Sequence, residues 1–502
     1  MTSKFHMIYD EKVLSNEQAE IVSEAHKGRN IIINAFAGTG KTLTLRAISS
    51  LALGDKKGLY LAFNKKIVDE ASAIFPSNVE CRTVHSLAYR SIASKYVKTG
   101  RLKQYLTPGI LCDKVFQDIP SMYGISAIRI SGMILSVIQR FCQSAALFIE
   151  KKHLNHLSLS DVEVADHEEV LGTILYFANA VWELLVNPQS DIPITPDVYL
   201  KLWALKSPQL QYDFILIDEA QDQTPVVIDV LSKQDAQQVW VGDKYQQIYG
   251  FRGAENALGL VDIESSFQLT QSFRYGEAIA KYSNHLINFY FNESTNIRGL
   301  STVNSRVSEI DEIEPQVVIC RTNFGVISEL AYQTYIEKKN VAINGDIGSL
   351  NRDLREAEKL MLGVKTSYPE FAPFKDWHDL VIFSKSDEGI HLRTLVNLVE
   401  QYDISLLLDL LNRAKSINEK YADIVVSTVH QVKGREWDVV RLADDFRGKG
   451  HSKYSDEEAR LLYVAATRAR SILDISLACA AHIPRGKDTT EQGKELQDER
   501  LL

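Results

Sequence analysis

A glycine-bearing turn between an apolar run and a helix constrains this chain more than any other stretch. Residues 31–33 are three isoleucines that predict a buried strand, and the turn over residues 35–42 follows directly. Such a turn aims backbone N–H groups and the positive end of a helix at one point, which suits phosphate oxygens. Lys41 is placed to reach the β- and γ-phosphates, and the Thr42 hydroxyl to ligate Mg²⁺. The turn therefore predicts a nucleotide-binding α/β fold.

A second apolar run, residues 214–217, ends in Asp218 and Glu219. Asp218, at the carboxyl end of its strand, would hold the same metal, and Glu219 would polarise the attacking water. The alternative is a glycine-rich turn and an acidic loop that coexist by chance. That alternative does not explain why each stretch follows a strand-like run and supplies what the other lacks. We therefore predict one hydrolytic site that uses ATP and Mg²⁺.

Composition sets limits on the class of protein. With 502 residues, 45% hydrophobic and 24% charged, the chain predicts a soluble globular protein of two to four domains. Its five cysteines are scattered without a C-x-x-C pair, which argues against a zinc site or a disulfide framework and favours a reducing cytosol. We expect a cytoplasmic protein, associated with the nucleoid or nuclear according to the organism. No uninterrupted apolar run approaches about 18 residues, so no membrane partner is expected.

The formal charge of −9 argues against a protein that coats nucleic acid by bulk attraction, although it leaves room for a narrow basic channel.

Further polar residues stand at or near strand-like runs. The amide of Gln18, about one strand before the phosphate loop, can read the edge of an adenine, and Gln246 can contact the γ-phosphate and the attacking water. Arg274 follows a strand and suits a γ-phosphate sensor or arginine finger. Arg468 falls in a helix expected over residues 457–473. Because the two arginines are so far apart in the chain, they suggest that two domains close on one nucleotide to form the site.

Aromatic and basic residues beside these motifs favour contact with unpaired bases. Residues 63–65 are Phe-Asn-Lys at the end of a strand, and Tyr249, Phe251 and Arg252 form an aromatic–x–aromatic–arginine run. Taken alone, residues 63–65 are equally well read as a core ring and a solvated lysine. A lone histidine such as His85 is more often a cap or a satisfied core residue than a ligand.

Read together in this order, several blocks resemble the superfamily 1A DNA helicases of the UvrD/Rep/PcrA type. They include NAFAGTGKT, IDEAQDQTP, GDKYQQIYGFRGAENAL, LTQSFRYGEAIA and LLYVAATRAR. Within the superfamily the F-box branch is the most similar, and the likeness extends from Leu14 to about Leu477. It implies two RecA-like P-loop NTPase domains with parallel sheets, each carrying an inserted, mostly helical subdomain. The expected ranges are 1–90 and 206–267 for the first domain, 91–205 for its insertion, 268–350 and 421–502 for the second domain, and 351–420 for its short insertion.

The resemblance also implies roles for individual residues. The catalytic residues would be Lys41, Asp218, Glu219, Gln246, Arg274 and Arg468, with Thr42 and Asp218 on the metal. The nucleotide would be bound by Gln18, Ala37, Gly38, Thr39, Gly40, Lys41, Thr42, Phe273 and Glu436, with Gln18 and Phe273 on the adenine and Glu436 on the ribose. Single-stranded DNA would be contacted by Phe63, Asn64, Lys65, His85, Tyr249, Phe251, Arg252, Arg321 and His430. We also expect Lys66 and Lys433 to lie in DNA-facing motifs.

The implied activity is ATP-driven 3′-to-5′ movement on single-stranded DNA that unwinds duplex or displaces bound proteins in recombination, repair or replication. Expected partners are single-stranded DNA and 3′-tailed duplex, with recombinase, replication or defence proteins beyond them. Two alternatives stay open. One is an ATP-gated DNA-binding switch or subunit without processive unwinding, and the other is an ATPase directed at RNA or at no nucleic acid.

The chain departs from the family pattern at three places. Ala35 stands where the widest phosphate-loop pattern has glycine, and Arg435 stands where the fifth motif has an apolar residue, followed by Trp437 in place of phenylalanine. The packing of Arg435 is therefore an open question. The stretch before the phosphate loop is too short for an F-box, so no ubiquitin-ligase adaptor is expected.

Overall fold

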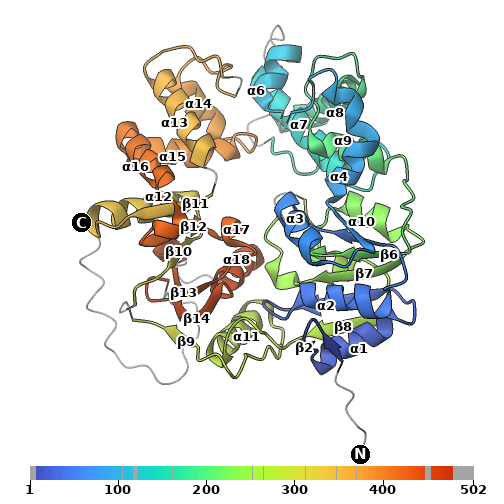
Figure 1. The fold of residues 1–502 in the computed structure, drawn as a ribbon. Coiled ribbons are helices and arrows are strands. Elements are labelled where there is room, and N and C mark those ends of the chain that lie inside the picture. The colour runs from blue at the N-terminus through green and yellow to red at the C-terminus, as the bar shows by residue number, and fades with distance from the viewer. Residues whose placement is uncertain are drawn as a thin grey trace, which may run out of the picture.

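The computed structural model has two α/β units that lie side by side, each with a group of helices beyond its sheet (Figure 1). The structure describes residues 7–103, 106–116, 122–159, 163–250, 253–263, 265–310, 313–345, 347–368, 370–446 and 454–478.

Six parallel strands form the first sheet, in the order β5-β4-β6-β7-β3-β8. The inner strands are apolar and almost wholly buried, as a parallel sheet with both faces covered requires. The strands are β3 (Ile31–Ala35), β4 (Gly58–Leu61), β5 (Val79–Arg82), β6 (Phe214–Ile217), β7 (Gln237–Gly242) and β8 (Ser265–Leu269). The accompanying helices are α1 (Asn16–Ala25), α2 (Lys41–Ala47), α3 (Lys65–Ile74) and α10 (Pro225–Ser232).

The second sheet repeats this plan, with six parallel strands in the order β11-β12-β10-β13-β14-β9. Its strands are β9 (Arg306–Ser308), β10 (Val317–Cys320), β11 (Val341–Asn344), β12 (Ile424–Thr428), β13 (Trp437–Leu442) and β14 (Ala469–Asp474). Its helices are α11 (Glu277–Phe291), α12 (Asn323–Ala331), α17 (Val429–Val432) and α18 (Asp456–Ala466). The two parallel sheets confirm the predicted fold class.

Helices interrupt both units. Between β5 and β6 lie α4 (Val84–Ala88), α5 (Ser94–Val97), α6 (Pro108–Leu111), α7 (Ala127–Gln143), α8 (His167–Val186) and α9 (Pro196–Ala204). Between β11 and β12 lie α13 (Ile347–Met361), α14 (Trp377–Ser384), α15 (Arg393–Gln401) and α16 (Ile404–Ser416). We call these groups the first and second insertion. The residues that divide insertions from units stay a prediction.

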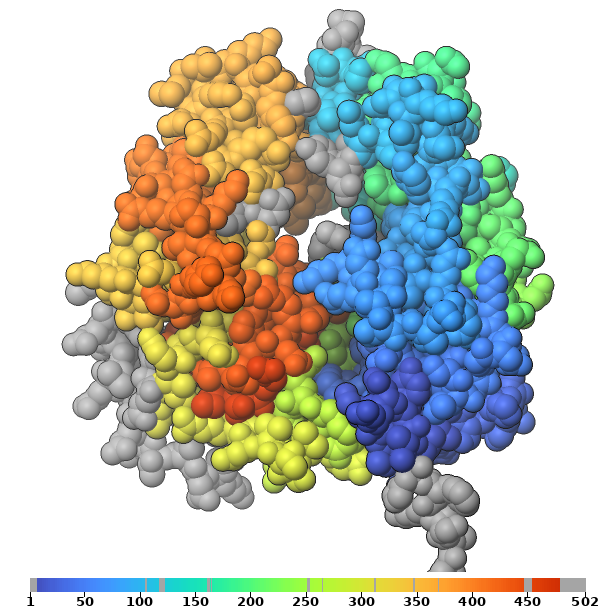
Figure 2. Space-filling view, viewed as in Figure 1, coloured from blue at the N-terminus to red at the C-terminus, as the bar shows by residue number. Residues whose placement is uncertain are grey.

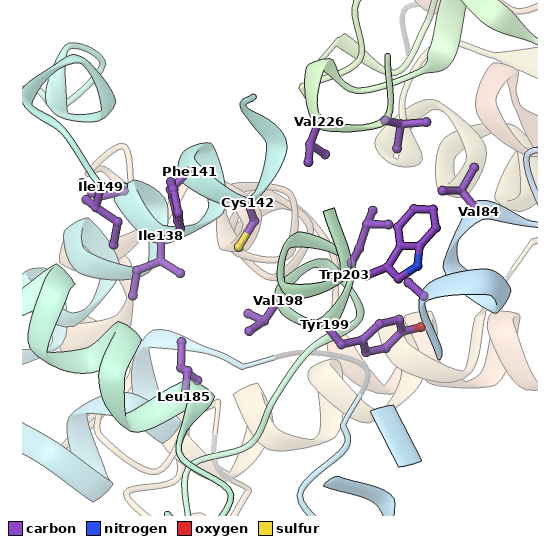
Figure 3. Close-up of a cluster of buried hydrophobic side chains, with 14 of the residues drawn as sticks. Val84, Ile138, Phe141, Cys142, Ile149, Leu185, Val198, Tyr199, Trp203 and Val226 are labelled. Carbon is purple, nitrogen blue, oxygen red and sulfur yellow. The ribbon is translucent and has the colours of Figure 1, made fainter. Parts of the chain in front are cut away.

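The first insertion shares one hydrophobic core with its sheet. In Figure 3, Phe141 of α7, Leu185 of α8 and Trp203 of α9 belong to the same buried cluster as Val226 of α10. The cluster continues into the sheet itself, where it includes Ile32. Because no solvent layer separates the two parts, we expect the first insertion to move together with the first unit.

Among the described residues, α8 is long and apolar enough to cross a membrane by length and composition alone. The core helix of a soluble protein passes the same test. Here 28% of the most apolar window is buried, and Val170, Ile174 and Ala178 place one stripe of α8 in the core beside α7.

The two insertions touch across the molecule. Arg129 on α7 donates from Nε to Glu388 Oε2 over 3.4 Å, and the Glu388 side chain is only 4% exposed. The approach is close, since a Cβ added to Gly132 would lie 2.7 Å from the Glu388 Cβ. Figure 2 shows an opening near the centre of the molecule, between the second unit with its insertion on one side and the first unit with its insertion on the other. The four parts therefore surround an opening.

We expect Arg129→Met to destabilise the contact between the insertions. It leaves the Glu388 carboxylate buried without its cation, which costs about 3 kcal/mol or more. Thermal unfolding and hydrogen exchange should show a lower melting temperature and faster exchange in α7 and α14. The control is Lys233→Ala, which breaks an exposed pair with Asp229 and should change neither. Unchanged exchange in Arg129→Met would show that the pair does not hold the insertions together.

Candidate nucleotide and nucleic-acid sites

The phosphate loop depends on two glycines with left-handed backbone conformations. Gly38 has φ +76° and Gly40 has φ +79°. A Cβ on Gly38 would also lie 2.5 Å from the Arg274 Cβ, so no side chain fits there. Phe273 N donates to Gly38 O over 2.8 Å. The segment that follows β8 therefore packs directly on the phosphate loop, where Ala37 and Thr39 are buried.

The predicted hydrolytic residues meet at the carboxyl edge of the first sheet. Lys41 Nζ lies 3.1 Å from Glu219 Oε1, and Tyr60 donates its hydroxyl to Asp218 Oδ2 over 2.6 Å. Glu219 adopts φ +50°, a conformation that a β-carbon disfavours. This backbone strain directs the carboxylate back toward the loop.

Electrostatics set the charge state of these groups. Burial would raise the pKa of Glu219, but the nearby ammonium groups of Lys41 and Lys433 lower it below its usual range. Burial and the neighbouring Glu219 raise the pKa of Asp218. Burial would lower the pKa of Lys41, but Glu219, Asp218 and Asp243 raise it. Glu219 is thus ionised, as a base that polarises water must be.

The donor set fits a hard divalent cation. Asp218 offers a carboxylate, 6% exposed, at the end of β6, and Thr42 is exposed in the first turn of α2. Lys41 is surrounded by acidic groups that attract a cation. Carboxylate and hydroxyl oxygens are ligands that Mg²⁺ accepts alongside phosphate oxygens. Asp218 and Thr42 would therefore hold the ion, which would neutralise phosphate charge when bound.

Gln246 connects the site to the second unit. Its Nε2 donates to Asp243 Oδ2 over 2.7 Å, and its Oε1 accepts from Arg468 Nη2 over 3.4 Å. Tyr463 on α18 also donates to Asp243 Oδ2, and its hydroxyl accepts from Ala37 N in the phosphate loop. Residues from both units thus form one hydrogen-bonded layer at the cleft.

Both predicted arginines lie at this cleft. Arg468 is 1% exposed and donates from Nε to Val464 O over 2.9 Å, and burial together with the nearby Arg274 lowers its pKa. Arg274 donates from Nε to Glu436 Oε2 over 2.6 Å and from Nη1 to Thr467 O over 3.0 Å. The structure brings the two guanidinium groups to one place.

The helix predicted over residues 457–473 is wrong in its second half. Helix α18 ends at Ala466, and Arg468 lies in the turn before β14. The Thr467 hydroxyl donates back to Tyr463 O, and the following residues pair with β13. The turn, rather than a helix, therefore directs Arg468 into the cleft.

The predicted adenine-binding pair borders the same loop. Gln18 is 1% exposed, and its Nε2 donates to Thr44 Oγ1 over 3.1 Å while its Oε1 accepts from Ser15 N. The Phe273 ring is 43% exposed, and both side chains approach Gly40. Their contact with adenine stays a prediction, as does that of Glu436 with the ribose.

Arg435, the departure from the fifth motif, is packed by two neighbours. Its guanidinium pairs with Glu419 and lies 4.8 Å from the centre of the Trp437 ring. Its carbonyl accepts from Arg468 Nη1 over 3.3 Å. The basic residue is accommodated because a carboxylate and an aromatic face both stabilise it.

Aromatic rings form a second surface beyond the ATP residues. Phe63 and Tyr249 stack with centroids 5.0 Å apart and planes at 17°, and His430 lies 5.9 Å from Tyr249. Together with Asn64 and His85, the first two rings line a cavity of about 760 Å³ between the first unit and its insertion. We call Phe63, Tyr249 and His430 the aromatic face.

The other residues predicted to contact DNA lie in different local environments. Asn64 caps α3 and Lys65 is exposed beside it, whereas His85 lies 3.5 Å from Asp197. Arg321 donates to Glu458 over 2.5 Å and to Asp445 O over 3.0 Å. Contact of these residues with DNA stays a prediction. Phe251 and Arg252 lie outside the described residues.

The sequence prediction misplaced Lys433. Its side chain is only 11% exposed and pairs with Asp222, so it does not present a cation to solvent. Asp222, Tyr60 and Tyr463 were not predicted to take part in the site. Asp222 follows Asp218 by four residues, a spacing that could have drawn attention to it, whereas nothing in the local sequence distinguishes Tyr60 or Tyr463 from core residues.

Comparison with known proteins matches both halves of the chain. A family model described as the UvrD/REP helicase N-terminal domain matches residues 14–267, and one described as the UvrD-like helicase C-terminal domain matches residues 380–479. The chain is 31% identical to the F-box DNA helicase protein 1 of Schizosaccharomyces pombe, over 93% of this chain and 58% of that protein. It is 30% identical to the F-box DNA helicase 1 of Gallus gallus, over 92% of this chain and 49% of that protein. The chain thus spans about half the length of these relatives. The ATP-dependent DNA helicase srs2 of Schizosaccharomyces pombe is 38% identical over 14% of this chain and 9% of that protein.

We expect Lys41→Ala, Glu219→Gln and Arg468→Ala each to lower ATP turnover by about 10³-fold or more, because each removes charge or hydrogen bonding aimed at the transferred phosphoryl group. Steady-state hydrolysis assays measure this. The exposed Lys233→Ala is the control and should keep wild-type turnover. Combined variants should lose little more than the single ones, since these residues act as a unit. Near-normal turnover in Glu219→Gln would contradict its assignment.

Proposed function

The chain belongs to the UvrD/Rep family of helicases, and we propose that it is an ATP-dependent DNA helicase or translocase that moves 3′ to 5′ on single-stranded DNA. Its work would be to unwind duplex or to displace bound proteins during recombination, repair or replication. Single-stranded DNA and 3′-tailed duplex would be its substrates, with ATP and Mg²⁺ at the cleft. The F-box DNA helicases of Schizosaccharomyces pombe and Gallus gallus are similar over most of this chain, and both are named as DNA helicases.

One observation carries the proposal. Gln246, which borders the hydrolytic site, and Tyr249, which belongs to the aromatic face, are three residues apart on one segment after β7. A shift of Gln246 that accompanies binding or loss of the γ-phosphate would therefore be passed along three positions of chain to Tyr249, the ring proposed to stack on bases. An ATPase without a nucleic-acid substrate has no need of this proximity.

The mechanism follows from the positions of the two arginines. Arg274 and Arg468 come from beyond β8, in or next to the second unit, while Lys41 and Glu219 belong to the first. ATP phosphates between them would draw the units together, and loss of the γ-phosphate would let them part. The aromatic face bridges the units through Tyr249 and His430, so each cycle would change its grip on a strand.

The exposed lysines at the start of α3 support DNA binding by a chain whose net charge is negative. Lys65 and Lys66 are exposed at the start of α3, next to Phe63. Helix starts and lysines both attract phosphate oxygens, so a local basic patch beside the aromatic face can bind a strand although the net charge is −9.

A second candidate is an ATP-gated DNA-binding switch that does not unwind processively. The buried contact between Arg129 and Glu388 favours it, because insertions held together leave less freedom around a duplex. Strand-displacement assays and assays that displace streptavidin from biotinylated single strands distinguish the two. A switch would show DNA-stimulated hydrolysis with neither displacement.

We expect single-stranded DNA to stimulate hydrolysis more than RNA or blunt duplex, and unwinding to start only from a 3′ tail. Substrates with 3′ or 5′ tails of equal length and a labelled displaced strand test the direction. Glu219→Gln is the negative control, since it should bind DNA without unwinding it. Efficient unwinding from the 5′ tail would contradict the proposed polarity while leaving the ATP site unaffected.

We expect Phe63→Ala and Tyr249→Ala each to weaken single-strand binding by about 1–3 kcal/mol, the cost of a lost base–aromatic stack. Fluorescence anisotropy with labelled poly-dT measures the change. Tyr421→Ala is the matched control, because that ring is 74% exposed and does not belong to the aromatic face. Normal DNA affinity with a lower melting temperature in Phe63→Ala would mean that the ring serves the core instead.

A further inference from the structure

Tyr60 is a core residue whose side chain has one polar atom, and that atom meets the carboxylate assigned to the metal. The side chain is 1% exposed, and its ring packs on Phe75 with centroids 4.5 Å apart. The hydroxyl donates to Asp218 Oδ2 over 2.6 Å. A phenylalanine would fill the same space without a polar atom to satisfy, so packing alone does not explain why a tyrosine stands here.

The sheet brings this hydroxyl to Asp218. Strands β4 and β6 run parallel, with Tyr60 opposite Leu216 in the register. Asp218 follows β6, and its N–H still donates to Leu61 O over 3.1 Å. The carboxylate therefore stands two positions beyond the residue opposite Tyr60, which is about 6–7 Å along a strand. A tyrosine side chain that leans along its strand can span that distance.

Asp218 is held on both oxygens by uncharged donors. Oδ2 accepts from Tyr60, and Oδ1 accepts from the backbone N–H of Glu219 over 2.9 Å. Each carboxylate oxygen has two lone pairs, so each keeps one for a further partner. The two hydrogen bonds oppose rotation of the carboxylate and fix the directions of the remaining lone pairs. Asp218 thus meets an incoming cation in one fixed orientation.

Mg²⁺ and Ca²⁺ respond differently to such a carboxylate. Mg²⁺ is small and demands near-octahedral geometry, whereas Ca²⁺ accepts flexible geometry and can take both oxygens of one carboxylate. A carboxylate locked in orientation therefore suits Mg²⁺, and one that is free to turn is better suited to Ca²⁺.

We infer that Tyr60 is the positioning residue that orients Asp218 for the divalent cation and makes the site prefer Mg²⁺ over Ca²⁺. The inference rests on the ATP- and Mg²⁺-dependent part of the proposed function. Partners that orient a metal-binding carboxylate commonly contribute to the affinity for the metal without touching it. Tyr60 would act in this way, through Asp218 and from within the core.

Two other roles for the hydroxyl lead to different expectations. If it only satisfies a buried carboxylate, its loss lowers stability and weakens the binding of all divalent cations alike. If Tyr60 only packs on Phe75, loss of the hydroxyl changes neither stability nor metal binding. A change in the preference between Mg²⁺ and Ca²⁺ is expected from the orienting role alone.

The test measures how Mg²⁺ and Ca²⁺ support binding of a fluorescent, non-hydrolysable ATP analogue to wild type and to Tyr60→Phe. Each cation is titrated at a fixed analogue concentration, with EDTA as the metal-free baseline. In Tyr60→Phe we expect the half-saturating Mg²⁺ concentration to rise by about tenfold or more, while the Ca²⁺ value and metal-free binding stay within about threefold.

The matched control is Tyr212→Phe. It removes a hydroxyl that donates to Glu80 Oε2 over the same distance of 2.6 Å, and it should shift neither cation value. Replacement of Tyr60 by 4-aminophenylalanine keeps a donor on the ring and should return the Mg²⁺ value toward that of wild type.

The outcomes separate the inference from the proposed function, because the test uses neither DNA nor turnover. Wild type that binds the analogue equally with Mg²⁺ and with EDTA would refute the Mg²⁺ part of the proposed function, and the inference with it. A Mg²⁺ requirement that Tyr60→Phe leaves unchanged, or an equal weakening for both cations, would overturn the inference alone. Should Tyr60→Phe not fold, Phe75→Leu loosens the ring but keeps the hydroxyl. It should then weaken Mg²⁺ more than Ca²⁺, and equal effects there would overturn the inference.

Discussion

Compensation of buried negative charge is the interaction on which the cleft depends. Asp218, Glu219, Asp222 and Asp243 all lie at the carboxyl edge of the first sheet, three of them at most 6% exposed. Isolated carboxylates there would be strongly destabilising, so the site requires cations close by. Lys41 comes from the phosphate loop and Lys433 from the second unit. The buried charge of the site is therefore compensated only when both units are in place.

The packing of the molecule concentrates movement at that cleft. The first insertion shares its core with the first sheet, and the second insertion shares a core with Val318 and Val426 of the second sheet. Between the units, Phe36 and Tyr245 of the first pack into the core of the second. This interface also carries the polar contacts of Tyr463 with Asp243 and of Arg468 with Gln246. Closely packed interiors resist deformation, so a cycle of nucleotide binding should act at the interface rather than within either unit.

The position of a functional residue could be predicted from the sequence where that residue directly follows a recognisable strand or turn pattern. Three isoleucines before a glycine turn predict a strand that ends in a phosphate loop, and an apolar run before Asp218 predicts the carboxylate that faces it. What could not be predicted depends on long-range packing. The burial of Lys433 follows from the meeting of α17 with the segment after β7, and the turn at Arg468 follows from the pairing of β14 with β13. The Arg435 packing likewise depends on Glu419, a residue sixteen positions away that no motif includes.

These observations together explain why the ATP and aromatic sites need so few shared residues. Gln246 and Tyr249 share one segment, while Lys433 returns from the other unit to touch both. A buried ion pair across an interface is costly to form and costly to break, so it resists gradual change and favours two distinct arrangements.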